Sequence, residues 1–285
     1  MISKKSDYKI LILGSSHTYD GIHPFYFWNL LGIRAFKEAF IGKGPMYNYY
    51  FYQEYKKHMG IPRMVIYGVD YFMYNITSSR SWMQRFNVDV IDSLYYDRGI
   101  SMLLANKNKI DNFLNSMLNN LQKNLNRVEH SQIEQNHVLM ENYLGLVNMG
   151  DVVSQEPPEY DKFFFFSYPG QEGVYFSRLM EELHRDQVTV LLVSLPEYEG
   201  TYRSNKFHRQ FLRAFKLYQR KFANIHFLNY NSFKKFDLKN TEYFIDGGYG
   251  KTNSHLSRAG AKILNRMLIE DLSKYLSGNE IKKRK

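Results

Sequence analysis

The chain has 285 residues, of which 44% are hydrophobic, 23% charged and 16% aromatic, and it contains no cysteine. Its formal net charge is +10 at neutral pH. The composition is too apolar for a disordered protein, and the lack of cysteine excludes disulfides, a thiolate nucleophile and cysteine-ligated metals. The length suits one large α/β domain or two small ones.

The first residues predict neither a signal peptide nor a membrane span. The apolar stretch after residue 7 is short, and no small-residue cleavage site follows it. No run in the chain approaches the ~18 apolar residues of a spanning helix. We therefore expect a cytoplasmic protein with no transmembrane segment.

Apolar runs of strand length alternate with helical patterns along most of the chain. We predict strands at residues 8–13, 35–41, 64–69, 188–195 and 225–228, and helices at 46–58, 173–185, 203–221 and 258–276. Such alternation predicts a parallel sheet covered by helices on both faces. The expected fold class is α/β, a three-layer α/β/α sandwich with a five-stranded, mostly parallel, flavodoxin-like sheet.

Residues 78–169 interrupt this alternation. They are rich in Asn, Gln and Met, and helical patterns cover residues 99–128 and 131–147. We predict a helical insertion between the third and fourth strands of a single domain that spans residues 1–285. Such an insertion could serve as a lid or as a partner surface.

The positive charge is concentrated in residues 203–221 and in a short basic tail. Phe207, Phe211 and Phe215 recur at helical spacing among the cations, which favours a helix with one packed and one solvated face. An anionic polymer, a nucleic acid or an acidic membrane surface is the functional alternative. Because no zinc-finger or RNP signature occurs, we expect no nucleic-acid partner and leave peripheral membrane association open.

Two adjacent serines follow the first predicted strand, in the segment Gly14-Ser15-Ser16-His17-Thr18. Ligands of open parallel sheets bind beyond the carboxyl ends of the strands. A serine hydroxyl at this point would therefore face the binding crevice. The alternative interpretation is a plain helix N-cap, since serine is a favoured capping residue.

A second polar segment, residues 246–260, precedes the last predicted helix. His255 lies within it, and histidine titrates near neutral pH, which suits a general base. Asp246 is the nearby carboxylate that could hold the imidazole in one tautomer. A lone loop histidine is usually a surface residue, but its combination with a serine at a strand end favours catalysis.

These segments resemble the conserved blocks of the SGNH (GDSL-like) hydrolases. The serine segment is similar to the first block, with Ser16 in the nucleophile position. Residues 39–72 resemble the second and third blocks, with Gly44 in place of the oxyanion glycine and Asp70 where the family has Asn. Residues 255–261 resemble the last block, with His255 as the base. The layout is most similar to the divergent branch that includes DltD-like and alginate-acetylation-like proteins.

The chain departs from the family pattern at three points. Thr252 occupies the position of the usual acid, so Asp246 or Asn253 would have to orient the histidine. A carboxylate at Asp70 would repel a developing oxyanion unless it is protonated or turned away. The export signal or membrane anchor that is common in envelope-acting relatives is also missing from the sequence. His17, next to the nucleophile, could line the pocket as a substrate donor.

The resemblance implies a serine esterase or O-acyltransferase that acts on ester-linked acyl groups, such as acetyl, of a carbohydrate. Its mechanism would pass through an acyl-enzyme on Ser16, with the Ser16 and Gly44 N–H groups binding the oxyanion. The alternative is a catalytically inactive binding or scaffold protein of this fold in polysaccharide assembly, which Thr252 and Asp70 favour. No metal-ligand spacing, P-loop or dinucleotide motif occurs, so we expect no cofactor and no metal. The expected partner is a carbohydrate or an acylated small molecule.

Overall fold

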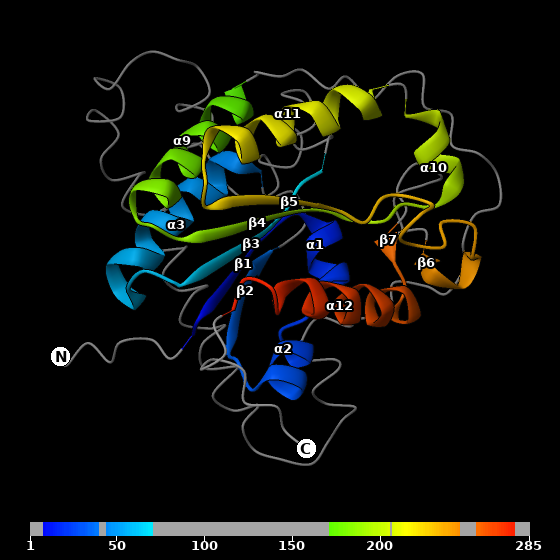
Figure 1. The fold of residues 1–285 in the computed structure, drawn as a ribbon, viewed down its shortest axis with the longest axis horizontal. Helices are drawn as coiled ribbons and strands as arrows, with labels where there is room; N and C mark the ends of the chain where they lie inside the picture. The colour runs from blue at the N-terminus through cyan, green and yellow to red at the C-terminus, as the bar shows by residue number, and fades with distance from the viewer. Residues whose placement is uncertain (1–7, 40–43, 71–170, 206, 246–254, 277–285) are drawn as a thin grey trace, which may run out of the picture.

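The computed structural model describes residues 8–39, 44–70, 171–205, 207–245 and 255–276. Five parallel strands form the main sheet in the order β2-β1-β3-β4-β5 (Figure 1). Since β1 pairs with β2 on one side and with β3 on the other, the strand order reverses beside β1. Such a switch point is where ligands of parallel sheets bind. The strands are β1 (Ile10–Gly14), β2 (Ala35–Ala39), β3 (Met64–Gly68), β4 (Thr189–Ser194) and β5 (Ile225–Asn229).

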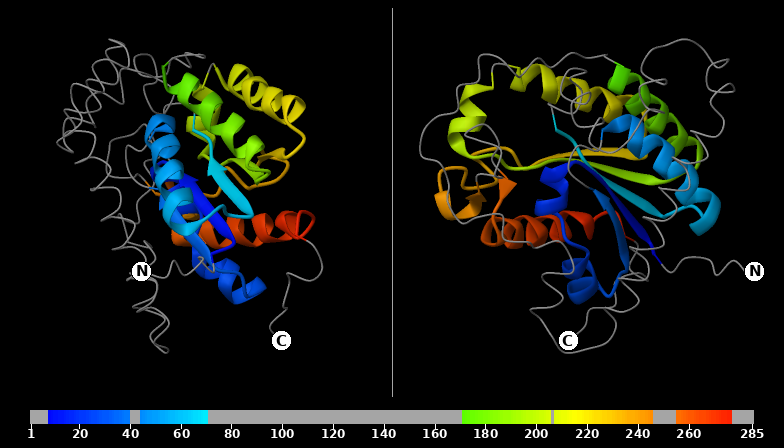
Figure 2. Two further views of the ribbon diagram at one scale, coloured as in Figure 1. Left: turned by 90° about the vertical axis from the view of Figure 1, so that its left-hand side faces the viewer. Right: turned by 180° about the vertical axis from the view of Figure 1, so that it is seen from behind.

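Helices cover both faces of this sheet (Figures 1 and 2). Successive residues of β1 supply both cores, because a strand has a two-residue period: Leu11 and Leu13 pack toward one face, Ile10 and Ile12 toward the other. The predicted α/β sandwich with five parallel strands is confirmed. The first face carries α3 (Pro45–Met59), α9 (Gln171–Arg185) and α11 (His208–Lys221), and the second carries α1 (Ser16–Gly21), α2 (Pro24–Leu31) and α12 (Arg258–Leu272).

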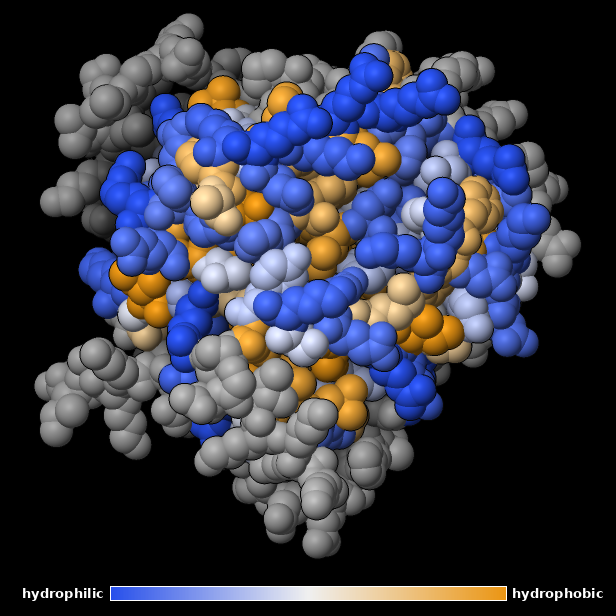
Figure 3. Space-filling view, viewed as in Figure 1, coloured by the Kyte–Doolittle hydropathy of each residue, from blue (hydrophilic) through white to orange (hydrophobic). Residues whose placement is uncertain are grey.

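The basic stretch that we expected to be one helix is divided into α10 (Glu199–Ser204) and α11. Asn205 ends α10, and its side chain accepts a hydrogen bond of 3.0 Å from the Phe207 N–H, a local turn that asparagine favours. On α11, Phe211 and Phe215 are buried, and the cations of the helix lie on its exposed face. Figure 3 shows the resulting hydrophilic band over α11. The expected solvated basic face is therefore present.

A small second sheet follows β5, and the sequence patterns did not predict it. The strands β6 (Phe244–Ile245) and β7 (His255–Leu256) are antiparallel, and a short 3-10 helix, η3 (Thr241–Tyr243), precedes them. Strands of two residues are too short to show an alternating pattern. The expected polar loop at His255 is therefore a buried strand that leads directly into α12.

The predicted insertion, residues 78–169, lies outside the described residues, so the single-domain organisation stays a prediction. Among the helices that the structure describes, none is long and apolar enough to cross a membrane.

Candidate active site

Two glycines let α1 lie directly against the ends of β1 and β3. Gly14 has a φ of +149°, and a Cβ added to it would lie 2.1 Å from Thr18 Oγ1. A Cβ added to Gly68 would lie 1.8 Å from the same atom. Because a larger residue at either position would displace the helix, these glycines fix the position of Ser16, its first residue.

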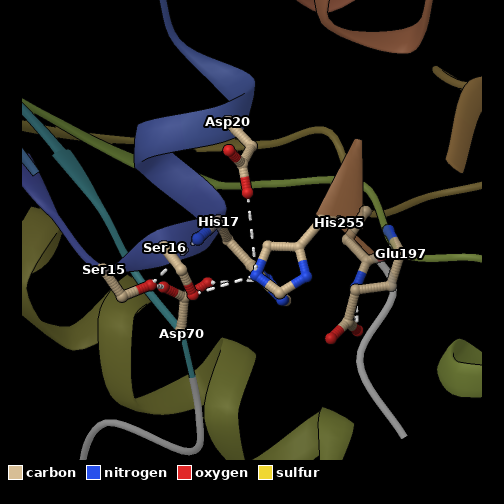
Figure 4. Close-up of polar contacts among 8 residues, drawn as sticks. Ser15, Ser16, His17, Asp20, Asp70, Glu197 and His255 are labelled. Carbon is tan, nitrogen blue, oxygen red and sulfur yellow. Dashed lines mark hydrogen bonds and ion pairs between the residues drawn. The ribbon is translucent and has the colours of Figure 1, made fainter. Parts of the chain in front are cut away.

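The structure brings Ser16 and His255 together at the carboxyl end of the sheet (Figure 4). The distance from Ser16 Oγ to His255 Nε2 is 2.9 Å, and both side chains are buried. His255 is held from both sides, because it pairs with Ile245 in the small sheet and Ser257, two residues later, caps α12. A serine hydroxyl within hydrogen-bond reach of an imidazole is the arrangement that activates a nucleophile.

The two histidines of the site affect each other. The rings of His17 and His255 meet edge to face with their centroids 4.4 Å apart. Burial, together with the positive charge on His17, holds the pKa of His255 well below its usual value. His255 therefore stays neutral, in the form that can accept a proton, to a lower pH than an exposed histidine.

A carboxylate of α1 lies beside the same nitrogen of His255. Asp20 Oδ2 is 3.9 Å from His255 Nε2. Asp20 comes four residues after Ser16, so the helical repeat places both groups on one side of α1. Burial raises the pKa of Asp20 to about 6, although Lys37 and His17 act in the opposite direction. Sequence reasoning missed Asp20, and its four-residue spacing from the serine was the signal that could have found it.

Asp70, which stands where the resemblance places an oxyanion Asn, is bound by two neighbours. Its carboxylate accepts a hydrogen bond from the Ser15 hydroxyl, and its Oδ1 lies 3.3 Å from His17 Nδ1. Burial disfavours charge on the His17 ring, but the Asp70 carboxylate outweighs it and raises the pKa of His17. Asp70 is thus turned toward Ser15 and paired with a cation.

Gly44 lies at the N-cap of α3, where it meets a carboxylate. Glu172 is fully buried, and its Oε2 accepts a hydrogen bond of 2.8 Å from the Met46 N–H. A Cβ added to Gly44 would lie 2.9 Å from this carboxylate. A negative charge at this end of α3 opposes the approach of an oxyanion, which any role of Gly44 as a donor would have to overcome.

Asp246 and Asn253, the two groups expected to orient His255, lie outside the described residues. Within the part of the chain that the structure describes, no cluster of three His, Cys, Asp or Glu side chains could hold a metal ion. Among the described residues, the site consists of the serine, the two histidines and the carboxylates that surround them.

No known protein family matches the sequence, and no curated protein matches it. Two solved structures are similar at 11% sequence identity each. One is a candidate acylhydrolase from Bacteroides fragilis, with a TM-score of 0.45, covering 97% of this chain and 93% of that chain. The other is a GDSL-like lipase from Bacteroides thetaiotaomicron, with a TM-score of 0.41, covering 94% of this chain and 88% of that chain.

Proposed function

We propose that this protein is a serine esterase or O-acyltransferase. The observation that carries the proposal is the 2.9 Å contact between Ser16 Oγ and His255 Nε2, placed at the switch point of a parallel sheet. The low pKa of His255 supports it, because the ring is a neutral acceptor over a wide pH range.

The proposed reaction has two steps. Ser16 Oγ attacks the ester carbonyl while His255 Nε2 takes the hydroxyl proton, and a tetrahedral oxyanion forms. Collapse of this intermediate breaks the bond to the leaving oxygen, which receives the proton from His255, and leaves the acyl group on Ser16. Water or a sugar hydroxyl then attacks the acyl-enzyme by the reverse proton transfers, which regenerates Ser16.

Stabilisation of the oxyanion is assigned to the first turn of α1. The Ser16 N–H belongs to the first residue of the helix, where backbone donors have no intrahelical acceptor. The positive charge on the neighbouring His17 favours negative charge at the same point. The Gly44 N–H is the second proposed donor. The nearby Glu172 carboxylate repels the oxyanion and weakens this contribution.

Hydrolysis of p-nitrophenyl acetate by purified protein tests the proposal. Ser16→Ala and His255→Ala should each reduce the rate to near background, since removing a nucleophile or its base costs up to about 10⁶-fold in kcat. The double variant should be no slower than either single variant, because the two groups act as a unit. Ser273→Ala, a change at an exposed serine that follows α12, serves as the control. Full activity of Ser16→Ala would refute the assignment.

We further propose, on the sequence resemblance, that the natural acyl group is acetyl and that the substrate is a carbohydrate ester. Incubation with an acetylated oligosaccharide distinguishes the two reactions. An esterase releases acetate, whereas an acyltransferase moves the acetyl group to an added oligosaccharide without releasing it. Absence of both reactions, with p-nitrophenyl acetate still cleaved, would contradict the carbohydrate substrate.

A catalytically inactive binding protein is the second candidate function. Two observations favour it: Asp70 occupies the position of an oxyanion donor, and Glu172 lies against Gly44. This candidate predicts that oligosaccharide binding, measured by calorimetry, occurs without turnover and is unaffected by Ser16→Ala. Turnover that depends on Ser16 would exclude it.

A further inference from the structure

A histidine that takes a proton at Nε2 must carry its resting proton on Nδ1. For His255, the proposed acceptor position at Nε2 faces Ser16. Its Nδ1 is buried and has no hydrogen-bond partner among the described residues. The carboxylate of Asp20 lies beside Nε2, on the wrong side to accept from Nδ1. An anion near Nε2 favours the Nε2–H tautomer, which cannot accept the serine proton, so a productive base needs a group that favours the opposite tautomer.

Glu197 is placed to supply that group. It follows β4 by three residues, at the same sheet edge as Ser16, and its side chain is only 3% exposed. Asn231 holds it through two hydrogen bonds: its Nδ2 donates to Glu197 Oε2 over 2.7 Å, and its Oδ1 accepts from the Glu197 N–H over 3.1 Å. Figure 4 shows Glu197 on the opposite side of the His255 ring from Ser16.

The charge of Glu197 acts on His17, the histidine that contacts His255. It contributes to the raised pKa of His17, whose ring contacts that of His255 with centroids 4.4 Å apart. Leu195, two residues before Glu197, reaches α1, because its Cδ2 would lie 2.5 Å from a Cβ added to Gly21. The segment after β4 therefore lies beside the helix that carries the serine.

We propose that Glu197 is the positioning residue of His255, replacing the acid that the sequence lacks at Thr252. This inference rests on the proposed esterase function. The Glu197 carboxylate favours the Nδ1–H tautomer in the resting enzyme and stabilises the imidazolium once Nε2 has taken the Ser16 proton. No proton moves to Glu197, in keeping with the role of the acid in serine-histidine-acid sites. Asp20 and Glu197 thus act on opposite nitrogens of one ring.

The first test compares Glu197→Gln with Glu182→Gln. Glu182 is also buried, but it lies in the last turn of α9, before the start of β4, and pairs with Lys56 on α3. Glu197→Gln should lower kcat by about 10²- to 10⁴-fold with little change in KM, and Glu197→Asp should restore part of the loss. Glu182→Gln should stay within a few-fold of the wild type. Thermal unfolding of each variant shows whether a loss of activity is due to misfolding.

The pH profile provides a readout that a structural role would not move. Loss of a carboxylate near an imidazole lowers its pKa, so the acid limb of kcat/KM should shift to lower pH in Glu197→Gln. An unchanged kcat and an unchanged profile would overturn the proposal. So would a total loss of activity in Asp246→Asn combined with normal activity in Glu197→Gln.

A second measurement does not depend on turnover. In ¹⁵N-histidine-labelled protein, His255 should be protonated on Nδ1, and Glu197→Gln should shift the Nδ1–H proton resonance upfield while Glu182→Gln leaves it in place. An Nε2–H tautomer in the wild type, or a resonance that Glu197→Gln does not move, would refute the role of Glu197.

Activity that depends on Ser16 but not on Glu197 would refute this inference and leave the proposed function standing. An Nδ1–H tautomer that depends on Glu197, in a protein with no esterase or acyltransferase activity, would refute the proposed function and leave the effect of Glu197 on His255 standing.

Discussion

Asp20→Asn tests whether the carboxylate beside His255 contributes to the reaction. In the transition state His255 gains positive charge at a point 3.9 Å from Asp20 Oδ2. Two unit charges at that distance attract by about 4 kcal/mol at an effective dielectric constant of ~20, and by about 1 kcal/mol in bulk water. Burial lowers the pKa of Lys37 to about 7, so its charge offsets part of this attraction only below that pH. The loss in kcat/KM should therefore lie between about 5-fold and 10³-fold.

The effect of Asp20→Asn should depend on pH. Because the pKa of Asp20 is about 6, its carboxylate is charged above that pH and protonated below it. The wild type and the variant should differ most at pH values well above 6 and converge below it. The assay is the initial rate of p-nitrophenyl acetate hydrolysis between about pH 5 and pH 9. Asp271→Asn, which removes a carboxylate at the other end of α12, is the control. Equal rates for Asp20→Asn and the wild type at alkaline pH would refute the electrostatic reasoning.

Three further predictions concern the capping and packing of α1 and the histidine beside the nucleophile, His17. Ser15→Ala removes both an N-cap and a donor to a buried carboxylate, so chemical denaturation should show a loss of stability of about 2–4 kcal/mol, against about 1 kcal/mol for the half-buried cap in Ser257→Ala. Equal losses of stability in the two variants would contradict the added contribution of the Ser15–Asp70 hydrogen bond. Gly68→Ala should lower the free energy of unfolding by about 1–3 kcal/mol, because the added methyl group clashes with Thr18. In a double-mutant cycle, Thr18→Ala should recover part of that loss, and additive losses would argue against the contact. His17→Asn should raise the pKa of the general base, so the acid limb of kcat/KM should move to higher pH; a shift to lower pH would be inconsistent with the charge on His17.

The three central strands, β1, β3 and β4, were predictable because they are continuous apolar runs that end at glycine or shortly before proline. The stretches at residues 8–13 and 188–195 differ by no more than two residues at either end from β1 and β4. Strands buried on both faces have this pattern in any parallel sheet, and it does not depend on distant parts of the chain. The position of Ser16 was predictable for the same reason, since the end of a strand at a switch point fixes where the next residue lies.

The environment of the site was not predictable from local patterns. β6 and β7 are two residues each, and their pairing joins residues 244–245 to residues 255–256 across a gap without periodicity. The basic stretch divides at Asn205, whose side chain and carbonyl accept hydrogen bonds from the Phe207 and His208 N–H groups, a turn that has no helical period. Glu197 follows a strand that is not adjacent in sequence to either Ser16 or His255, so only the packing of the sheet brings it to the site.

The proposed function requires that Ser16 is a nucleophile activated by His255. A fluorophosphonate probe measures this most directly, because an activated serine displaces its fluoride and retains the phosphonyl group as a stable ester. We predict one adduct per chain by intact mass spectrometry, located on Ser16 by peptide mapping and absent from His255→Ala. No adduct on the folded wild-type protein, or an adduct on any other residue that persists in Ser16→Ala, would show that Ser16 is not an activated nucleophile.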